Sequence, residues 1–161
     1  MSEWRHILIP ALFAAIALSL FSCSEPQSYE EFVRTGSKDE NGMYRFTLNM
    51  SDSLAVYDLS FYSRIECGNG KLAELRDFPL DITLQSPSGR KYWEKVYFPV
   101  HRSSKGSNFY SHQYIMPYRS GIRPEEAGEW ELAVRIDADE HIPGFRGLGI
   151  ILKKKGWDIR N

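Results

Sequence analysis

The stretch Tyr44-Arg45-Phe46-Thr47-Leu48-Asn49-Met50 alternates apolar and polar residues at every position. Because successive side chains of an extended chain point to opposite faces, this pattern predicts a β-strand with one buried and one solvated face. Such a strand buries its apolar face only if a second layer of structure covers it. The stretch therefore favours a protein made of packed β-sheets.

Six further segments with a strand-like texture follow this one along the chain. They lie at residues 54–66, 80–85, 90–100, 109–116, 130–136 and 148–154, and Pro117 is expected to end the fourth of them. Turn residues such as Ser51-Asp52-Ser53 and Ser86-Pro87-Ser88-Gly89 separate the segments, and no long amphipathic helix pattern occurs. The sequence predicts an all-β fold: an antiparallel β-sandwich of about seven strands with a jelly-roll or immunoglobulin-like topology.

The N-terminal region has a different composition, which indicates a targeting signal. An apolar run at 7–21 is shorter than the roughly 20 residues that span a bilayer. The stretch Leu18-Ser19-Leu20-Phe21-Ser22-Cys23 overlaps the end of this run. This arrangement is typical of a bacterial lipobox, in which Cys23 becomes the lipidated first residue of the mature protein. The alternatives are an ordinary signal peptide with a coincidental cysteine or a short membrane anchor. Residue 24 is Ser and not Asp, which favours the outer membrane.

These observations divide the chain into three parts. Residues 1–22 are predicted to be a lipoprotein signal peptide, and 43–161 a β-sandwich domain. Between them, 23–42 is predicted to be the lipidated N-terminus and a polar tether, with room for a short ordered piece around Tyr29, Phe32 and Val33.

Charge and cysteine content exclude several functions. The chain carries 20 basic and 21 acidic residues, so nothing indicates nucleic-acid binding or a polybasic membrane patch. There are two cysteines, and if Cys23 carries lipid then Cys67 has no intramolecular partner. Cys67 is expected to be a small buried hydrophobic residue.

No group of residues has the spacing of a catalytic or metal site. His101, His112 and His141 lack the close ligand pairs of a zinc centre. The loop Asp137-Ala138-Asp139-Glu140-His141 could bind a hard cation such as Ca²⁺, but a solvated loop is the favoured interpretation. Glu125 and Glu126 are adjacent on a corner and are expected to stay solvated, with ordinary acidity. We therefore predict no catalytic residues, no metal, no cofactor and no enzymatic activity.

Glycines and aromatic residues offer two further candidates. The stretch Gly144-Phe145-Arg146-Gly147-Leu148-Gly149 precedes a strand and no helix, so it predicts a bulge or a close approach between strands and not a phosphate loop. Aromatic residues that could stack on sugars are Tyr92, Trp93, Tyr97, Tyr110, Tyr114 and Trp157. Aromatic side chains in sandwiches mostly fill the core, so sugar binding is the alternative here.

Three stretches, together with the lipobox, make the chain resemble the gliding-motility lipoprotein H (GldH) family of the Bacteroidota. They are Ser86-Pro87-Ser88-Gly89-Arg90-Lys91-Tyr92, Ile122-Arg123-Pro124-Glu125-Glu126-Ala127-Gly128-Glu129-Trp130 and Ile142-Pro143-Gly144-Phe145-Arg146-Gly147-Leu148-Gly149-Ile150. The first resembles the family's hairpin turn, the second its corner before an aromatic strand, and the third its closing glycine strand. Arg146 departs from the acidic residue usual in the family, and 103–108 replaces a Trp- and Gly-rich stretch.

The resemblance implies an envelope lipoprotein associated with gliding and type IX secretion machinery, and it brings no catalytic residues. We expect a non-catalytic interaction or scaffolding protein that contacts the membrane through its lipid at Cys23 and has envelope protein partners. The alternative is a surface glycan-binding lipoprotein. The loops at 101–108 and 137–145 are the expected interaction surface.

Overall fold

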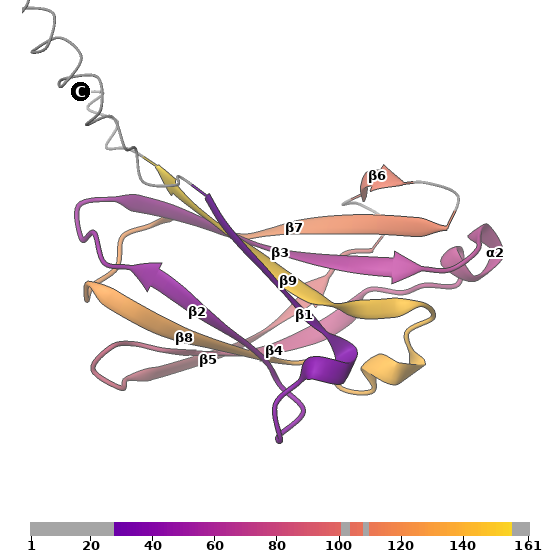
Figure 1. The fold of residues 1–161 in the computed structure, drawn as a ribbon, viewed down its shortest axis with the longest axis horizontal. Coiled ribbons are helices and arrows are strands. Elements are labelled where there is room, and N and C mark those ends of the chain that lie inside the picture. Colours follow the sequence, from indigo (N-terminus) through magenta and orange to yellow (C-terminus); the bar gives the residue numbers. More distant parts are fainter. Residues whose placement is uncertain (1–27, 101–103, 108–109, 156–161) are drawn as a thin grey trace, which may run out of the picture.

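The computed structural model describes residues 28–100, 104–107 and 110–155, so Cys23 and Trp157 lie outside the described residues. The described chain forms two stacked antiparallel sheets (Figure 1). The five-stranded sheet contains, in spatial order, β1 (Ser28–Arg34), β9 (Phe145–Lys155), β3 (Val56–Glu66), β7 (Ser111–Ile122) and β6 (Ser104–Ser107). The four-stranded sheet contains β2 (Tyr44–Met50), β8 (Gly128–Arg135), β4 (Phe78–Gln85) and β5 (Lys91–Phe98). The short helices are η1 (Thr35–Ser37), α2 (Asn69–Leu72) and η2 (Asp139–His141).

The order of the strands is that of a jelly roll. With β6 set aside, the sheets are β1-β9-β3-β7 and β2-β8-β4-β5, and every connection except the β4–β5 hairpin crosses from one sheet to the other. This arrangement is two interlocked Greek keys in a double-sheet sandwich. It confirms the predicted all-β antiparallel sandwich and selects the jelly roll from the two topologies that the sequence left open.

The sandwich begins earlier in the chain than residue 43. Strand β1 lies within the segment expected to be a tether, and it pairs with β9 over its whole length, from Ser28 opposite Lys153 to Arg34 opposite Gly147. The Phe32 ring stacks on Tyr62 with centroids 5.5 Å apart. The short ordered piece expected around Tyr29, Phe32 and Val33 is this strand. Its strand character was not predicted because β1 is an edge strand with mostly exposed or half-buried side chains, so its apolar residues do not alternate strictly.

Strand β7 continues beyond the proline that was expected to end it. It runs through Pro117 to Ile122, and its pairing with β3 shifts register beside Ser60, the residue opposite Pro117. Strand β6 pairs only near the start of β7, so this part of β7 is also an edge. Proline is tolerated at bulges and on edges because no ladder hydrogen bond is lost there.

The core lies between the two sheets. Alternate residues of β2 are buried in the order that the sequence predicted, with Arg45, Thr47 and Asn49 exposed between them. Among the largest fully buried side chains are Tyr44, Phe61, Leu80, Phe98, Leu148 and Ile150. Cys67 is buried and is not disulfide-bonded, as expected for a small hydrophobic residue.

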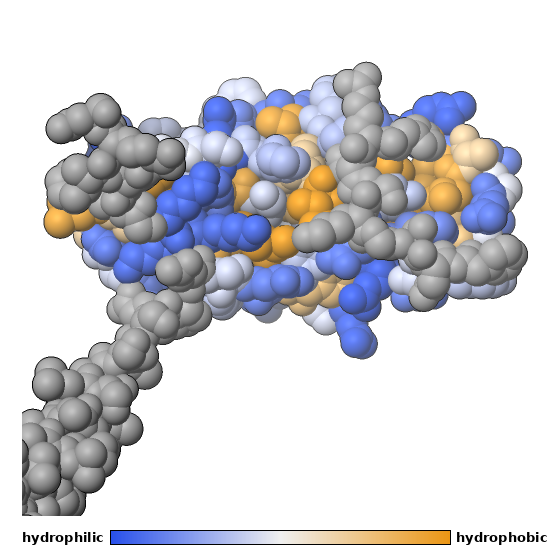
Figure 2. Space-filling model, turned by 90° about the horizontal axis from the view of Figure 1, so that it is seen from above, coloured by the Kyte–Doolittle hydropathy of each residue, from blue (hydrophilic) through white to orange (hydrophobic). Residues whose placement is uncertain are grey.

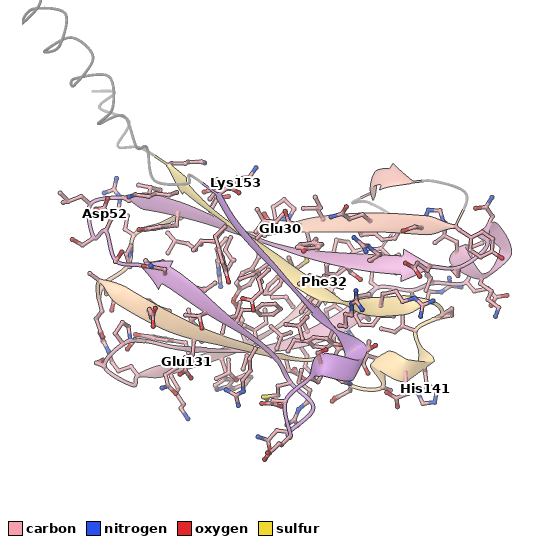
Figure 3. The ribbon with its side chains drawn as sticks, in the orientation of Figure 1. Glu30, Phe32, Asp52, Glu131, His141 and Lys153 are labelled. Carbon is pink, nitrogen blue, oxygen red and sulfur yellow. The ribbon has the colours of Figure 1, made fainter. Side chains whose placement is uncertain are left out.

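The strands give the sandwich two distinct ends, which Figure 3 marks with Asp52 at one and His141 at the other. The N-terminal end contains the start of β1, the turn at 51–55, the hairpin at 86–90 and the end of β9. The far end contains η1, α2 and η2. The chain therefore enters the sandwich at the end opposite the η2 loop.

The outer face of the five-stranded sheet is only partly hydrophilic. Ile115 on β7 and Ile151 on β9 are half-buried there. Viewed from the side of β7 and β3, Figure 2 shows apolar residues among hydrophilic ones.

Candidate binding site on the open side of the sandwich

The site lies on one long side of the sandwich, between strand β5 of one sheet and strand β7 of the other. We call this the open side. A cleft of about 380 Å³ follows this side, and we call it the seam cleft. Its rim includes Tyr92, Trp93, Glu94, Tyr118, Arg119 and Ile122. Its volume lies at the lower end of the range for ligand sites in proteins.

The floor of the seam cleft is the hydrophobic core itself. Leu48, Met50 and Leu132 line it, yet at most 2% of each of these side chains is exposed. Tyr92 stacks on Trp130 at one wall, with ring centroids 6.3 Å apart. The cleft is therefore a shallow apolar groove along the seam between the sheets, and its walls are aromatic.

A carboxylate bridges the two sheets across the cleft. Glu94 on β5 accepts a hydrogen bond from the Tyr118 hydroxyl, and Arg119 Nη2 lies 2.8 Å from each carboxylate oxygen of Glu94. Burial alone would raise the pKa of Glu94, but these two donors outweigh it and the pKa is lowered. Burial and the bond to Glu94 raise the pKa of Tyr118 to about 12. Glu94 is thus held as an anion and acts as a clamp between the sheet edges.

Strand β5 presents aromatic side chains on both of its faces. Tyr92 points toward the seam and is 44% exposed, whereas Trp93 and Tyr97 lie on the outer face and are 83% and 63% exposed. A strand has only one face toward the core, so aromatic residues on the other face stay in solvent. Exposed aromatic residues gathered on one edge strand are a feature of interaction sites.

The hairpin that starts β5 is fixed by a residue from a distant corner. Glu126 accepts hydrogen bonds from the Ser88 backbone N–H at 2.9 Å and the Ser88 hydroxyl at 2.7 Å, and from Arg90 Nη2 at 2.6 Å. Gly89 adopts φ +89°, which the turn between β4 and β5 requires. The corner at 123–128 therefore sets the position of the whole hairpin.

This arrangement corrects the expectation that Glu126 is an ordinary solvated carboxylate. Hydrogen bonds from Arg90 and then Ser88 lower the pKa of Glu126 to about 2. Trp130 Nε1 donates to the Glu126 carbonyl at 3.0 Å. The hairpin within 86–92 and the corner within 122–130 thus contact each other, and the contact is structural.

The glycine-rich stretch 144–149 closes the opposite side of the sandwich. A side-chain carbon on Gly147 would lie 2.2 Å from the Val33 carbonyl oxygen, and one on Gly149 would lie 2.3 Å from the Tyr62 ring. The pairing of β9 with β3 also shifts register between Arg64 and Ile65. The glycines therefore permit both a bulge and a close approach, as the sequence predicted.

The acidic loop is not arranged as a cation site. Asp139 turns inward, where Lys38 Nζ lies 2.9 Å from each of its carboxylate oxygens and the buried Tyr44 hydroxyl donates to it. Glu140 instead faces the exposed His141 at 3.5 Å. Within residues 28–100, 104–107 and 110–155, no group of three or more His, Cys, Asp or Glu could hold a metal ion.

The remaining candidates from the sequence are dispersed. His112 and Tyr114 are buried on β7, Tyr110 is exposed at the far end, and His101 lies outside the described residues. Burial raises the pKa of the Cys67 thiol. Both expected interaction loops belong to the far end, although residues 101–103 and 108 of the first lie outside the described part. In the part of the chain that the structure describes, no helix is long and apolar enough to cross a membrane.

Sequence reasoning named Tyr92, Trp93 and Tyr97 but missed Glu94, Tyr118 and Arg119. The useful signal was the presence of aromatic residues on both faces of one strand, at 92, 93 and 97. The partners on β7 carry no such signal, because Glu94 and Tyr118 are 24 residues apart and meet only through the topology.

Two solved structures are remotely similar to this chain. No family model matches the chain, and no curated protein matches it. A protein from Sulfurospirillum deleyianum of known crystal structure has a TM-score of 0.38 at 10% identity, covering 83% of this chain and 100% of that one. An arabinose-bound α-L-arabinofuranosidase has a TM-score of 0.32 at 13% identity, over 84% of this chain and 23% of the enzyme. Both TM-scores are low, and neither likeness carries an argument about function.

Proposed function

We propose that this protein is a lipid-anchored component of the bacterial cell envelope that acts as a non-catalytic interaction or scaffolding protein through the open side of its sandwich. The observation that carries the proposal is strand β5, where Trp93 and Tyr97 are 83% and 63% exposed beside the seam cleft. Exposed aromatic residues of this kind supply much of the binding energy in protein interfaces.

The N-terminal sequence supports the anchoring part of the proposal. The lipobox ends at Cys23, and an anchor with two or more acyl chains holds a protein stably on a membrane. Four residues separate Cys23 from Ser28, where β1 begins. Their extended reach is roughly 17 Å. The sandwich would therefore sit close to the membrane, and we propose the outer membrane because residue 24 is not Asp.

The resemblance to the GldH family supports the same class of function. It favours an association with gliding and type IX secretion machinery, as a partner and not as a catalyst. The contact between the hairpin at 86–90 and the corner at 123–128 gives the resembling stretches a structural role next to β5. We therefore place the binding surface on β5 and not on the loops of the far end.

Metabolic labelling with a palmitate analogue tests the anchor. We expect labelling of the wild-type chain and none of Cys23→Ala, and labelling that persists in the variant would overturn the anchor.

Co-purification from mild detergent tests the interaction. Wild-type protein should retain envelope proteins that Trp93→Ala/Tyr97→Ala loses, whereas the control Tyr110→Ala, an exposed tyrosine at the far end, should retain them. Equal recovery from all three proteins would contradict a role for β5.

Glycan binding is the second candidate, and the outer face of β5 favours it. Trp93 and Tyr97 lie on one face of the strand at four residues' separation, which is roughly 13 Å. Lys95 and Asp81 form an ion pair between them at 3.1 Å and are both exposed enough to bond sugar hydroxyls. Glycan-array binding that Trp93→Ala abolishes, with retained binding by Tyr110→Ala, would support this function over the first.

A further inference from the structure

The two sheets of the sandwich differ by one strand, and the difference lies on the open side. Strands β1 and β2 form the edges of the other side and contact each other, so the sheets are aligned there. Counting from that side, β6 occupies the fifth position of its sheet, and no described strand occupies the fifth position of the other. The free edge of β5 therefore faces a place where one more strand would fit.

The phase of the β4–β5 hairpin determines which backbone groups of β5 are free. The Ser86 N–H donates to the Arg90 carbonyl at 2.8 Å, and the two residues lie directly opposite each other. In an antiparallel pair hydrogen-bonded and non-hydrogen-bonded positions alternate. Trp93, Lys95 and Tyr97 consequently point their amide and carbonyl groups away from β4, toward the position that no described strand occupies.

An added strand could bury the side chains on its inner face. A neighbouring strand lies about 4.8 Å from β5, and every second side chain points to the inner face. On that face the seam cleft offers apolar walls from Tyr92, Ile122 and Trp130. An extended segment with alternate apolar residues would bury them there, as peptides do when they add a strand to an exposed sheet edge.

The outer face supplies a charge preference. Arg135 on β8, Asp81 on β4 and Lys95 on β5 lie side by side across the sheet, so the charges alternate plus, minus, plus. The Lys95–Asp81 ion pair is 3.1 Å long. A carboxylate on the next strand would continue the alternation, and opposite charges directly across a ladder are favourable.

We infer that the free edge of β5 binds an extended segment of a partner protein, which pairs with the backbone of Trp93, Lys95 and Tyr97, places apolar residues in the seam cleft and sets an acidic residue opposite Lys95. The inference rests on the proposed interaction function and names the class of partner. A second copy of this chain fits less well, because its own β5 would bring Lys91 and Lys95 against another basic strand.

Selection of phage-displayed ten-residue peptides against the full-length protein in detergent tests the inference. Enriched peptides should alternate apolar and polar residues and carry Asp or Glu among the polar ones. They should bind Lys95→Pro at least tenfold more weakly than Lys95→Ala. Both variants remove the lysine charge, but only proline removes the outward N–H, and proline is tolerated on an edge strand.

Equal affinity for Lys95→Pro and Lys95→Ala, or selection that yields no alternating peptides, would overturn the inference. Lys95-dependent self-association in light scattering would overturn it in favour of a second copy. If Lys95→Pro fails to fold, hydrogen exchange in the wild type decides: the amides of Trp93, Lys95 and Tyr97 should become protected when an enriched peptide binds, and unchanged exchange contradicts strand addition. Loss of lipid labelling or of co-purification leaves this experiment unaffected, so the two proposals fail separately.

Discussion

The two long sides of the sandwich are made from the same kind of alternating strand, yet they are closed in different ways. The closed side is the one where β1 and β2 form the sheet edges. There, backbone atoms of β1 lie so near Gly147 and Gly149 of β9 that neither position has room for a side chain. Where this side meets the far end, the buried Tyr44 hydroxyl donates to Asp139, which also binds Lys38. On the open side, the Glu94 clamp joins the sheet edges, and aromatic rings remain in solvent.

The difference indicates where the molecule can accept a partner without unfolding. The closed side contains close backbone packing and a buried ion pair, and disruption of either is costly. The open side gains less from packing because its edge strand is solvated. Its exposed residues are therefore free to change partners, and four substitutions of decreasing effect test this contrast.

Substitution of Gly147 by Ala should be the most damaging. The residue has φ +147°, and its new Cβ would lie 2.2 Å from the backbone oxygen of Val33. Backbone strain and overpacking together should cost about 3 kcal/mol or more of unfolding free energy. Urea unfolding measures it, with Gly36→Ala as control because nothing lies within 4 Å of that position. Equal stability of the two variants would contradict the tight packing of β1.

Asp139→Asn should cost about 2 kcal/mol, because it leaves Lys38 without its charged partner while keeping an acceptor for Tyr44. Burial tends to raise the pKa of Asp139, but bonds from Tyr44 and Lys38 lower it overall. Stability from this carboxylate is therefore present above its unfolded pKa and is lost as the pH falls through the lowered value. The exposed Asp137→Asn, two residues away, should leave the urea midpoint unchanged; a shift as large as that of Asp139→Asn would argue against the buried network.

Glu126→Gln tests the support of the open side. The pKa of Glu126 is lowered from 4.5 to about 2 by Arg90 and Ser88. Because the folded pKa is the lower one, the stability advantage of the wild type over the variant should be complete above about pH 4.5 and should vanish toward pH 2. Melting temperatures measured across this range report the difference. An advantage that does not change with pH would show that the contact is not electrostatic.

Trp93→Ala should have the smallest effect on stability, within about 0.5 kcal/mol, because the side chain is 83% exposed. Thermal unfolding of the purified variant measures it, and a large loss would mean that Trp93 packs on the sandwich and is not available to a partner. Together with the loss of binding proposed for Trp93→Ala/Tyr97→Ala, a small effect would separate binding from folding on this side.

Much of the fold could be predicted from local pattern. The alternation at 44–50 sets the two faces of β2, and the seven expected segments all became strands. Strand β1 was hidden because an edge strand needs little apolar surface, and the continuation of β7 through Pro117 depended on its position at an edge. The choice of the jelly roll could not be made, because it depends on which strands become neighbours.

The site was predictable only in part, for the same reason. Trp93 and Tyr97 could be found because aromatic residues occurred on both faces of one segment. In the seam cleft, Glu94 of β5 contacts Tyr118 and Arg119 of β7, and no local sequence pattern indicates this contact. Glu126 was underestimated because its donors, Arg90, Ser88 and Ser86, are 36 to 40 residues away.

If the protein is anchored at Cys23 as proposed, the pairing of β1 with β9 has a mechanical consequence. Tension from the membrane would enter the domain at Ser28, and among the described strands only β9 pairs with β1. A pull along the axis of β1 loads all seven paired positions in parallel, as shear, and does not open them one at a time. Strand β1, which lies in the segment expected to be a tether, is thus the element that would bear the load, and it packs closely on the glycines of β9.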